Sequence, residues 1–448
     1  MNTDCRATVT TASAARERAA VFLKRHRMHH TQIDAEAELS KFLNALEEDY
    51  RLGGKTGRMI PTWVGDYKAP AEGERAVTVI DIGGTNVRCA VIAIGPEGVR
   101  RIENLLRFRT PGVAAAVDTA GFYGKIVEGV RDNLVTDEIG ICFSLATIPQ
   151  RDRDAVMVAG GKQIKIRDML GKKVGESFRS AMKERGLDGG ARITVINDTV
   201  AAALGGQAAV SAEKAGTYRS FLGFIYGTGI NMCYREQSGE WINTETAAYD
   251  TFPTGDLDDE FDAGLIDPGG DRLEKMVSGG YQGGLMSCIL RAAAREGVLS
   301  PQTDASLRES VLERSRLTKQ LGRKTLSTRD LSAFSGDPRG DNLIAAACRS
   351  EADRELIKAV CDNMTRRSAR ICAVVLTAGL LRSGAGVNGS GPAFITAEGS
   401  TYLKQIDFRE RLADEMEKLA GERYGLSWEF HTVPDVILRG IAVACLSE

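Results

Sequence analysis

VIDIGGTNVRCAVI, residues 79–92, joins two apolar runs through a turn that has almost no side chains. The runs predict two strands, 77–82 and 87–94. Gly83 and Gly84 would let backbone N–H groups approach a ligand, and such a turn forms an anion cradle. Thr85 adds a hydroxyl. Asp81 repels a phosphate unless a cation lies between them, which favours Mg²⁺. The alternative is a plain hairpin with a solvated aspartate. The dinucleotide pattern G-x-G-x-x-G is absent.

A second stretch repeats this pattern. FLGFIYGTGINMCYRE, residues 221–236, again places a glycine-rich turn between two apolar strands, which suggests a duplicated unit with one phosphate-binding turn in each domain. Two such turns suit a nucleoside triphosphate held from two sides. A third candidate is AEGSTY, 397–402, where Gly399 and Ser400 follow a strand and begin a helical segment. Each of these could also be an ordinary turn.

A polar pair follows another buried strand. In VINDTVAAALGG, residues 195–206, Asn197 and Asp198 stand between a strand at 193–197 and a helical segment. Polar side chains at such strand ends lie where α/β sheets bind ligands. An ordinary aspartate is ionised at neutral pH and could accept a proton from an alcohol that attacks phosphorus. Asp198 could instead be a helix cap.

Composition limits the class of protein. The 448 residues are too many for one core, so two domains are expected, and a net charge of −2 gives no sign of a nucleic-acid or membrane-surface partner. The longest apolar run, 371–381, is too short to cross a bilayer, and the N-terminal segment lacks a signal-peptide core. Nine scattered cysteines favour buried thiols and the cytoplasm. RHRMHH, 25–30, could bind a metal but favours a solvated helix face.

The rest of the chain alternates strands and helices. Further strands are expected at 139–145, 393–397 and 427–431. Helices are expected at 12–50 (one or two), 117–134, 173–187, 270–296, 352–382, 407–420 and 435–446. MIPTWV, 59–64, is expected to be extended because Pro61 disfavours a helix at Ile60.

Nine ordered motifs make the chain resemble the hexokinase family, the sugar kinases of the actin-like ATPase fold. The motifs are GRMIPTWV, DIGGTNVR, CFSLA, INDTVAA, GTGIN, INTE, RLEKMVSGGYQG, LSTRDLSA and EGSTY. The resemblance, to a bacterial-type single-unit hexokinase, runs from about residue 20 to the C-terminus. It implies an α/β protein of two domains around a deep cleft. The small domain would hold 62–196 plus 434–448, and the large domain 1–61 plus 197–433.

The resemblance also implies a mechanism. ATP would lie with its phosphates between the two glycine-rich turns, with Mg²⁺ held indirectly near Asp81. Asp198 would be the general base for the 6-hydroxyl of glucose or a related hexose. The hexose would be held by Ser144, Lys162, Asn197, Asn231, Glu245 and Glu274. The nucleotide would contact Asp81, Gly83, Gly84, Thr85, Asn86, Arg88, Gly227, Thr228, Gly229, Gly399 and Ser400. Arg88 could stabilise transferred charge or be structural. A monomer or homodimer is expected.

The sugar motifs depart from the family pattern. Leu145 and Ala146 replace Phe-Pro, Gly161 replaces a threonine, Asp271 replaces a glutamine, and Glu398 replaces an aspartate near the nucleoside. A lost neutral hydrogen bond is worth roughly 0.5–1.5 kcal/mol, which retunes a pocket without abolishing it. We therefore expect an active hexose kinase. The alternatives are a sugar-sensing protein with little turnover and an actin- or chaperone-like ATPase.

Overall fold

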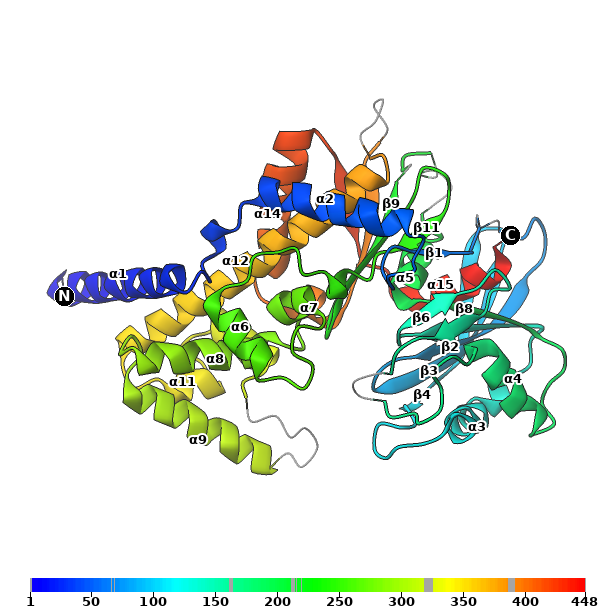
Figure 1. Ribbon diagram of the computed structural model, residues 1–448, viewed down its shortest axis with the longest axis horizontal. Coiled ribbons are helices and arrows are strands. Elements are labelled where there is room, and N and C mark those ends of the chain that lie inside the picture. Colours follow the sequence, from blue (N-terminus) through cyan, green and yellow to red (C-terminus); the bar gives the residue numbers. More distant parts are fainter. Residues whose placement is uncertain are drawn as a thin grey trace.

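The computed structural model describes residues 2–65, 67, 69–160, 164–210, 214, 216–218, 220–317, 325–385 and 391–447. These residues form two large β-sheets, a small two-stranded sheet and the helices around them (Figure 1). The sheet built from the first half of the chain lies on the right of the view. The second sheet lies near the centre, and most of the helices lie to its left.

The first sheet has the strand order β4-β3-β2-β5-β8. β2 (Arg75–Ile82), β3 (Asn86–Gly95) and β4 (Gly98–Arg109) are antiparallel neighbours, whereas β5 (Glu138–Phe143) and β8 (Arg192–Ile196) run parallel to β2. The predicted hairpin is confirmed, with Asp81 opposite Arg88. The short strands β6 (Thr147–Pro149) and β7 (Ala155–Met157) pair separately.

The second sheet has the order β1-β11-β10-β9-β12-β13. β9 (Phe221–Tyr226) and β10 (Ile230–Arg235) form a hairpin, and β11 (Trp241–Asn243) extends it antiparallel. β12 (Ala393–Glu398) and β13 (Trp428–His431) continue parallel on the other side, and β1 (Ile60–Thr62) closes the edge. The strands β11-β10-β9-β12-β13 therefore repeat the order and directions of β4-β3-β2-β5-β8 in the first sheet. This repeat agrees with the duplicated unit that the sequence suggested.

Two helices lie between the sheets. α5 (Asp198–Gln207) follows β8, and α15 (Val436–Leu446) follows β13, so the two are equivalent in the repeat. Each packs on the other unit's sheet: α5 contacts β9, β10 and β12, and α15 contacts β2, β5 and β8. Their backbones meet directly, because a Cβ on Gly440 would overlap the carbonyl oxygen of Ala201 and one on Gly205 would overlap that of Val436.

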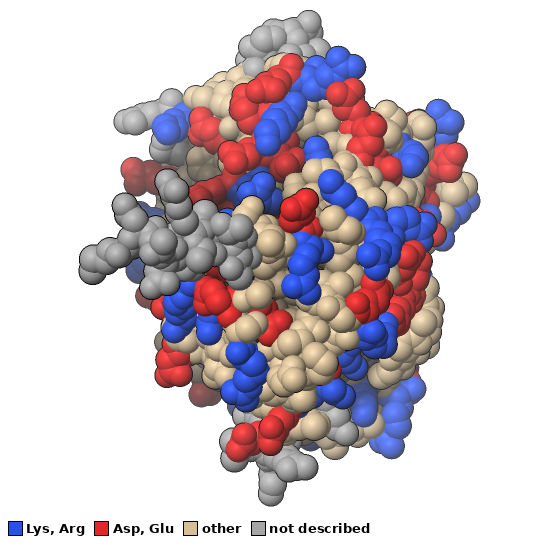
Figure 2. Space-filling model, turned by 90° about the vertical axis from the view of Figure 1, so that its left-hand side faces the viewer, with Lys and Arg blue, Asp and Glu red and all other residues tan. Residues whose placement is uncertain are grey.

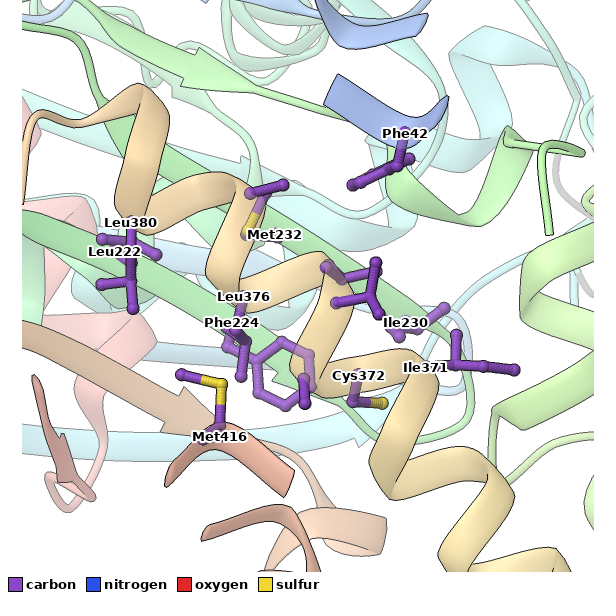
Figure 3. Packing of buried hydrophobic residues seen from close by; sticks show 14 of the residues in the cluster. Phe42, Leu222, Phe224, Ile230, Met232, Ile371, Cys372, Leu376, Leu380 and Met416 are labelled. Carbon is purple, nitrogen blue, oxygen red and sulfur yellow. The ribbon is translucent and has the colours of Figure 1, made fainter. Parts of the chain in front are cut away.

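Helices cover the outer faces of both sheets. α3 (Thr119–Gly129) and α4 (Val174–Lys183) pack on the first sheet. On the second, α2 (Ala35–Arg51), α12 (Glu351–Arg382) and α14 (Phe408–Met416) pack on the sheet, and Leu376 and Met416 lie beside Phe224 (Figure 3). Phe42 of α2 belongs to the same core, where its ring packs on that of Tyr249. The C-terminal half of α12 is apolar all round because protein surrounds it on every side. No helix in the described part of the chain is both long and apolar enough to cross a membrane.

A helical region adjoins the second sheet. α1 (Asn2–Arg25), α8 (Gln282–Arg295), α9 (Pro301–Leu317), α10 (Thr328–Gly336) and α11 (Leu343–Ala347) share a core with the first half of α12. The other helices in the described part of the chain are α6 (Asp256–Ala263), α7 (Arg272–Val277), α13 (Ser400–Lys404), η1 (His30–Gln32), η2 (Arg131–Asn133), η4 (Thr246–Ala248) and the π-helix η6 (Glu417–Arg423).

Several boundaries differ from those predicted. The helix expected at 270–296 is divided into α7 and α8 by a turn at Ser278–Tyr281, where Gly279 and Gly280 interrupt the pattern. The helix expected at 407–420 passes from α14 into η6. The remaining predicted strands and helices are present, and most of their ends are shifted by a few residues. The first helix differs more, because α1 begins at Asn2 and not at the predicted residue 12.

The histidine cluster is not a solvated helix face. α1 ends at Arg25, and the following turn places His26 in hydrogen-bonding contact with Glu296 at 2.6 Å. His30 bonds to Asn363 through Nδ1 at 3.0 Å, and burial is the main cause that lowers the pKa of both His29 and His30. Among the described residues, no group of three or more His, Cys, Asp or Glu side chains could hold a metal ion.

Surface charge is mixed. On the face shown in Figure 2, Lys and Arg side chains alternate with Asp and Glu, and no broad area there has a single sign. Arg16 with Glu355 at 2.9 Å and Arg25 with Glu296 at 2.6 Å are examples of ion pairs that anchor α1. This distribution agrees with the small net charge of the chain.

Candidate functional site

Asp198 is the first residue of α5 and closely follows β8, the edge strand of the first sheet. The helix cap is Asn197, whose side-chain oxygen accepts a hydrogen bond from the Thr199 backbone N–H at 2.8 Å. The interpretation of Asp198 as the cap is therefore wrong. Because its neighbour caps the helix, the Asp198 carboxylate is available for another role at the half-buried start of α5.

The surroundings of Asp198 favour its protonated form. Burial raises the pKa of its carboxyl, and the negative charge of Asp81 raises it further, whereas hydrogen bonds from Thr199 and Ser144 lower it. Ser144 follows β5, where its N–H donates to the Ile82 carbonyl at 3.3 Å. A carboxylate with a raised pKa binds a proton more readily than a solvated one, which suits a general base.

A chain of amides holds Glu245. Asn231 donates from Nδ2 to Asn243 Oδ1 at 2.9 Å, and Asn243 donates from its own Nδ2 to Glu245 Oε1 at 2.7 Å. The Asn231 side-chain oxygen accepts from the backbone N–H groups of Met232 and Thr246. Sequence reasoning missed Asn243, although it lies in the INTE motif. Asn243 is buried and bonds to both Asn231 and Glu245, so it fixes the position of the Glu245 side chain.

The charges of three other carboxylates act on Glu245. Burial raises the pKa of Glu245 to about 7, and the charges of Asp198, Asp271 and Glu274 raise it further. Glu274 lies against the GTG turn, since a Cβ on Gly229 would overlap its Oε2 atom. The structure thus brings together Ser144, Asp198, Glu245 and Glu274 of the predicted sugar set. Lys162, predicted for the same set, lies outside the described residues.

A threonine for which the sequence analysis predicted no role fixes the DIGGTN turn. Thr110, after β4, donates from its hydroxyl to the Gly83 carbonyl at 2.8 Å and from its N–H to the Thr85 carbonyl at 3.0 Å. The Gly83 N–H donates to the Asn86 carbonyl at 3.1 Å, which closes the turn. Gly84 lies at the tip, and Thr85 is exposed.

Arg88 is paired with Asp81 across the hairpin. Its Nε and Nη2 atoms lie 2.9 and 2.8 Å from Asp81 Oδ2, and its Nη1 lies 3.9 Å from Asp435, the residue before α15. The charge of Arg88 also acts on Glu398 at the end of β12. Arg88 thus reaches from the first sheet toward the second, and a structural role is evident.

The GTG turn belongs to a cluster of close backbone contacts. The Gly227 carbonyl accepts hydrogen bonds from the Gly279 N–H at 2.9 Å and the Thr401 hydroxyl at 2.8 Å. Gly399 has φ of 118°, and a Cβ there would overlap the Tyr226 carbonyl oxygen. A Cβ on Gly227 would lie 3.7 Å from the Ser400 backbone nitrogen, so two predicted turns are adjacent. Thr228, at the tip of the GTG turn, is exposed.

The first turn could accommodate a divalent cation only indirectly. Arg88 occupies one oxygen of the buried Asp81 carboxylate, and the charge of Asp81 acts on both Asp198 and Glu398. The carboxylates around Arg88 supply negative charge that suits a cation such as Mg²⁺. A single carboxylate, however, supplies too few ligands to hold the ion without other groups. The residues therefore fit Mg²⁺ bound mainly by substrate phosphates and water.

Comparison with known proteins identifies the family. Two models, both described as hexokinase, match residues 19–208 and 221–447. Hexokinase-7 of Oryza sativa subsp. japonica is 26% identical over 412 residues, covering 83% of this chain and 84% of the relative. Hexokinase-1 of Schizosaccharomyces pombe is 27% identical over 427 residues, covering 87% and 82%.

The fold is also that of solved hexokinases. The structure of a hexokinase from Schistosoma mansoni complexed with glucose superimposes with a TM-score of 0.72 at 20% identity, covering 97% of this chain and 99% of the other. This similarity confirms the predicted fold class, the two-domain actin-like ATPase fold.

Proposed function

The chain belongs to the hexokinase family, and from that premise we propose that it transfers the γ-phosphate of Mg-ATP to the 6-hydroxyl of a hexose, with Asp198 as general base. The observation that supports this most directly is the placement of Asp198. It begins α5 beside Ser144 and is drawn toward protonation by burial and by Asp81. These conditions favour removal of the hydroxyl proton as the oxygen attacks phosphorus.

The neighbouring side chains would hold the hexose. A sugar is a ring of hydroxyl groups, and each buried hydroxyl needs a hydrogen-bonding partner. The carboxylates of Glu245 and Glu274 can accept from hydroxyls, and charge-assisted hydrogen bonds are the stronger kind. Asn231 would act mainly through Asn243 and Glu245, because its oxygen is already used by two backbone N–H groups. We retain Asn197 and Lys162 as proposed ligands.

The two glycine-rich turns would hold the nucleotide. Backbone N–H groups and the exposed hydroxyls of Thr85 and Thr228 would face the phosphates, and Gly399 and Ser400 would approach the nucleoside. Mg²⁺ bound with ATP would neutralise charge on the transferred phosphoryl group. Arg88 would orient Asp81 toward that ion through the two contacts to Oδ2.

We place the domain boundaries at the crossings near 197 and 433. The small domain would hold 62–196 plus 434–448, and the large domain 1–61 plus 197–433. Closure about these crossings would exclude water and limit ATP hydrolysis. The cytoplasm is the proposed compartment, which is supported by the eight free cysteines that the structure describes.

A coupled assay of ADP release tests the function. Wild type, Asp198→Asn and the surface control Asp152→Asn would be assayed with Mg-ATP and glucose, mannose, fructose or glucosamine, with a blank lacking sugar. We expect sugar-dependent release, a loss of about 10²–10⁴ in kcat for Asp198→Asn, and little change for the control.

Sugar binding by calorimetry separates the alternatives. The Asp198→Asn variant should keep its sugar affinity within a few fold. Tight sugar binding without ADP release in the wild type would instead favour a sugar sensor. ADP release equal with and without sugar would favour a plain ATPase.

A further inference from the structure

A cavity of about 150 Å³ lies in the helical region, between α8, α9 and the segment that leads into α10. Figure 1 shows these helices to the left of the second sheet, away from the first. Five aliphatic side chains make up most of the lining: Leu290, Leu307, Val311, Leu312 and Leu326. Leu312 is 42% exposed, so the cavity is open to solvent and a ligand can enter. An apolar cavity of about this volume is large enough to bind benzene.

Positive charge lies beside the aliphatic lining. Arg291 of α8 and Arg308 of α9 both line the cavity, and Asp304 is the one carboxylate among the described residues that does so. Asp304 pairs with Arg308 at 2.7 Å, which leaves the charge of Arg291 in excess. Arg291 donates from Nε to the Ser287 carbonyl at 3.0 Å, and no carboxylate in the described part of the chain pairs with it.

These features select the chemistry of a ligand. The aliphatic lining favours an apolar body, and the net positive charge beside it favours a negative group over a positive one. The volume limits the body to about the size of a six-carbon ring. A planar guanidinium such as that of Arg291 matches a carboxylate, because the two can form a pair of parallel hydrogen bonds.

The segment that lines one side of the cavity also holds a glycine-rich turn. The Leu326 N–H donates to the Ser287 hydroxyl oxygen at 3.0 Å, which ties the segment to α8. Two residues later, the Thr328 hydroxyl donates to the Gly279 carbonyl at 2.6 Å. The Gly279 N–H in turn donates to the Gly227 carbonyl of the GTG turn at 2.9 Å. Two hydrogen bonds thus connect this segment with the GTG turn.

We propose that the cavity is an effector site for a small carboxylate with an apolar body, and that its occupant strengthens nucleotide binding. A ligand packed against Leu326 orders the segment from Leu326 to Thr328 and, through Gly279, the GTG turn. A turn that is already ordered loses less conformational entropy when the nucleotide binds, so the nucleotide binds more tightly. The effect on the nucleotide rests on the proposed function of the GTG turn, whereas binding of the carboxylate does not.

Calorimetric titration with phenylacetate tests the site. Phenylacetate joins a six-carbon ring to a carboxylate that is ionised at neutral pH, and 2-phenylethanol is a neutral molecule of similar size. We expect the wild type to bind phenylacetate with a Kd of about 0.1–1 mM. It should bind 2-phenylethanol about tenfold more weakly, because the alcohol forms no charge-assisted hydrogen bond with the arginine.

Two variants of the same helix locate the charge that binds the carboxylate. Arg291→Gln should weaken phenylacetate binding about tenfold and leave the binding of 2-phenylethanol unchanged. Arg295→Gln is the matched control, because Arg295 lies one turn later on α8, does not line the cavity and pairs with Glu260 at 2.9 Å. The control should keep the wild-type affinity for both molecules.

A second set of titrations tests the link to the GTG turn. The affinity for a non-hydrolysable ATP analogue with Mg²⁺ would be measured with and without phenylacetate, and the affinity for phenylacetate with and without the analogue. Linkage requires the two factors to be equal, and we expect each to be about fivefold. Thr328→Val removes the hydrogen bond to Gly279, so it should keep the wild-type affinity for phenylacetate and lose this coupling.

Each opposite result overturns a stated part of the inference. Absence of phenylacetate binding, or equal weakening in Arg291→Gln and Arg295→Gln, would overturn the site. Phenylacetate binding that leaves the affinity for the ATP analogue unchanged would overturn the link, and so would coupling that persists in Thr328→Val. If the protein transfers phosphate to no sugar, the kinase proposal fails, but these titrations still decide the inference because none of them requires turnover.

Discussion

Glu245→Gln should make the protein more stable at alkaline pH while impairing its use of sugar. The native carboxyl titrates with a pKa of about 7, compared with 4.5 for an unperturbed glutamate, and burial is the main cause. Glutamine retains a side-chain oxygen that can accept the hydrogen bond from Asn243. The substitution therefore removes the ionisable group with little change in shape.

The sign and size follow from proton linkage. Between pH about 4.5 and 7 the native carboxyl holds a proton that the unfolded chain has released, so stability falls as pH rises through this window. At 1.36 kcal/mol per pKa unit, the wild type loses about 3 kcal/mol by pH 8. Glu245→Gln has no such loss, so it should gain about that much relative to wild type between pH 4.5 and 8.

Melting temperatures at pH 5 and pH 8.5 would measure this difference. Unfolding entropy of about 2.1 cal/mol/K per residue gives roughly 0.9 kcal/mol/K for the chain, so 3 kcal/mol corresponds to about 3 °C. Glu97→Gln, which changes an exposed glutamate in a turn, controls for the general effect of removing a carboxyl.

A difference in melting temperature between Glu245→Gln and wild type that does not change with pH would refute the reasoning. If Glu245→Gln and wild type differ by the same amount at both pH values, the Glu245 carboxyl is not held in its protonated form. A variant less stable than wild type only at pH 8.5 would reverse the predicted sign.

Three further predictions concern the fold and the metal. Gly440→Ala should place a methyl group on the Ala201 carbonyl and lower the melting temperature by several degrees, whereas a fully folded variant with unchanged melting would contradict the close helix contact. Asp258→Ala should leave buried Arg367 unpaired and cost roughly 3–5 kcal/mol by denaturant unfolding, and a loss below 1 kcal/mol would count against that pair. Removal of Mg²⁺ with EDTA should abolish ADP release without changing sugar affinity by calorimetry. Persistent release would show that the site near Asp81 needs no divalent ion.

Local pattern was sufficient for much of the fold. The alternation of apolar runs with glycine turns predicted both hairpins, because a hairpin is defined by residues close together in sequence. The family resemblance assigned 434–448 to the small domain, but nothing in the sequence predicted that α15 lies between the sheets. Its apolar sequence shows that it is buried but does not show which sheet covers it.

The site residues that were missed act through other residues. Asn243 donates a hydrogen bond to Glu245, and Thr110 donates one to the Gly83 carbonyl. Motif patterns in the sequence did not predict either contact. Asn197 rather than Asp198 is the cap because the carbonyl of Asn197 is the first to accept an intrahelical bond, from Ala201. Either residue type caps well, so composition could not separate them.

The exchange of helices between the sheets has a consequence for protein synthesis. The strands of the first sheet are complete once Ile196 has been made, but α15, which covers their inner face, begins at Val436. More than half of the chain is translated in between, at about 5–20 residues per second. For that interval the nascent sheet must keep apolar residues such as Val77, Val79 and Ile92 out of contact with other chains. We expect a chaperone that binds extended apolar segments to associate with ribosomes stalled within this interval and to leave once α15 has emerged.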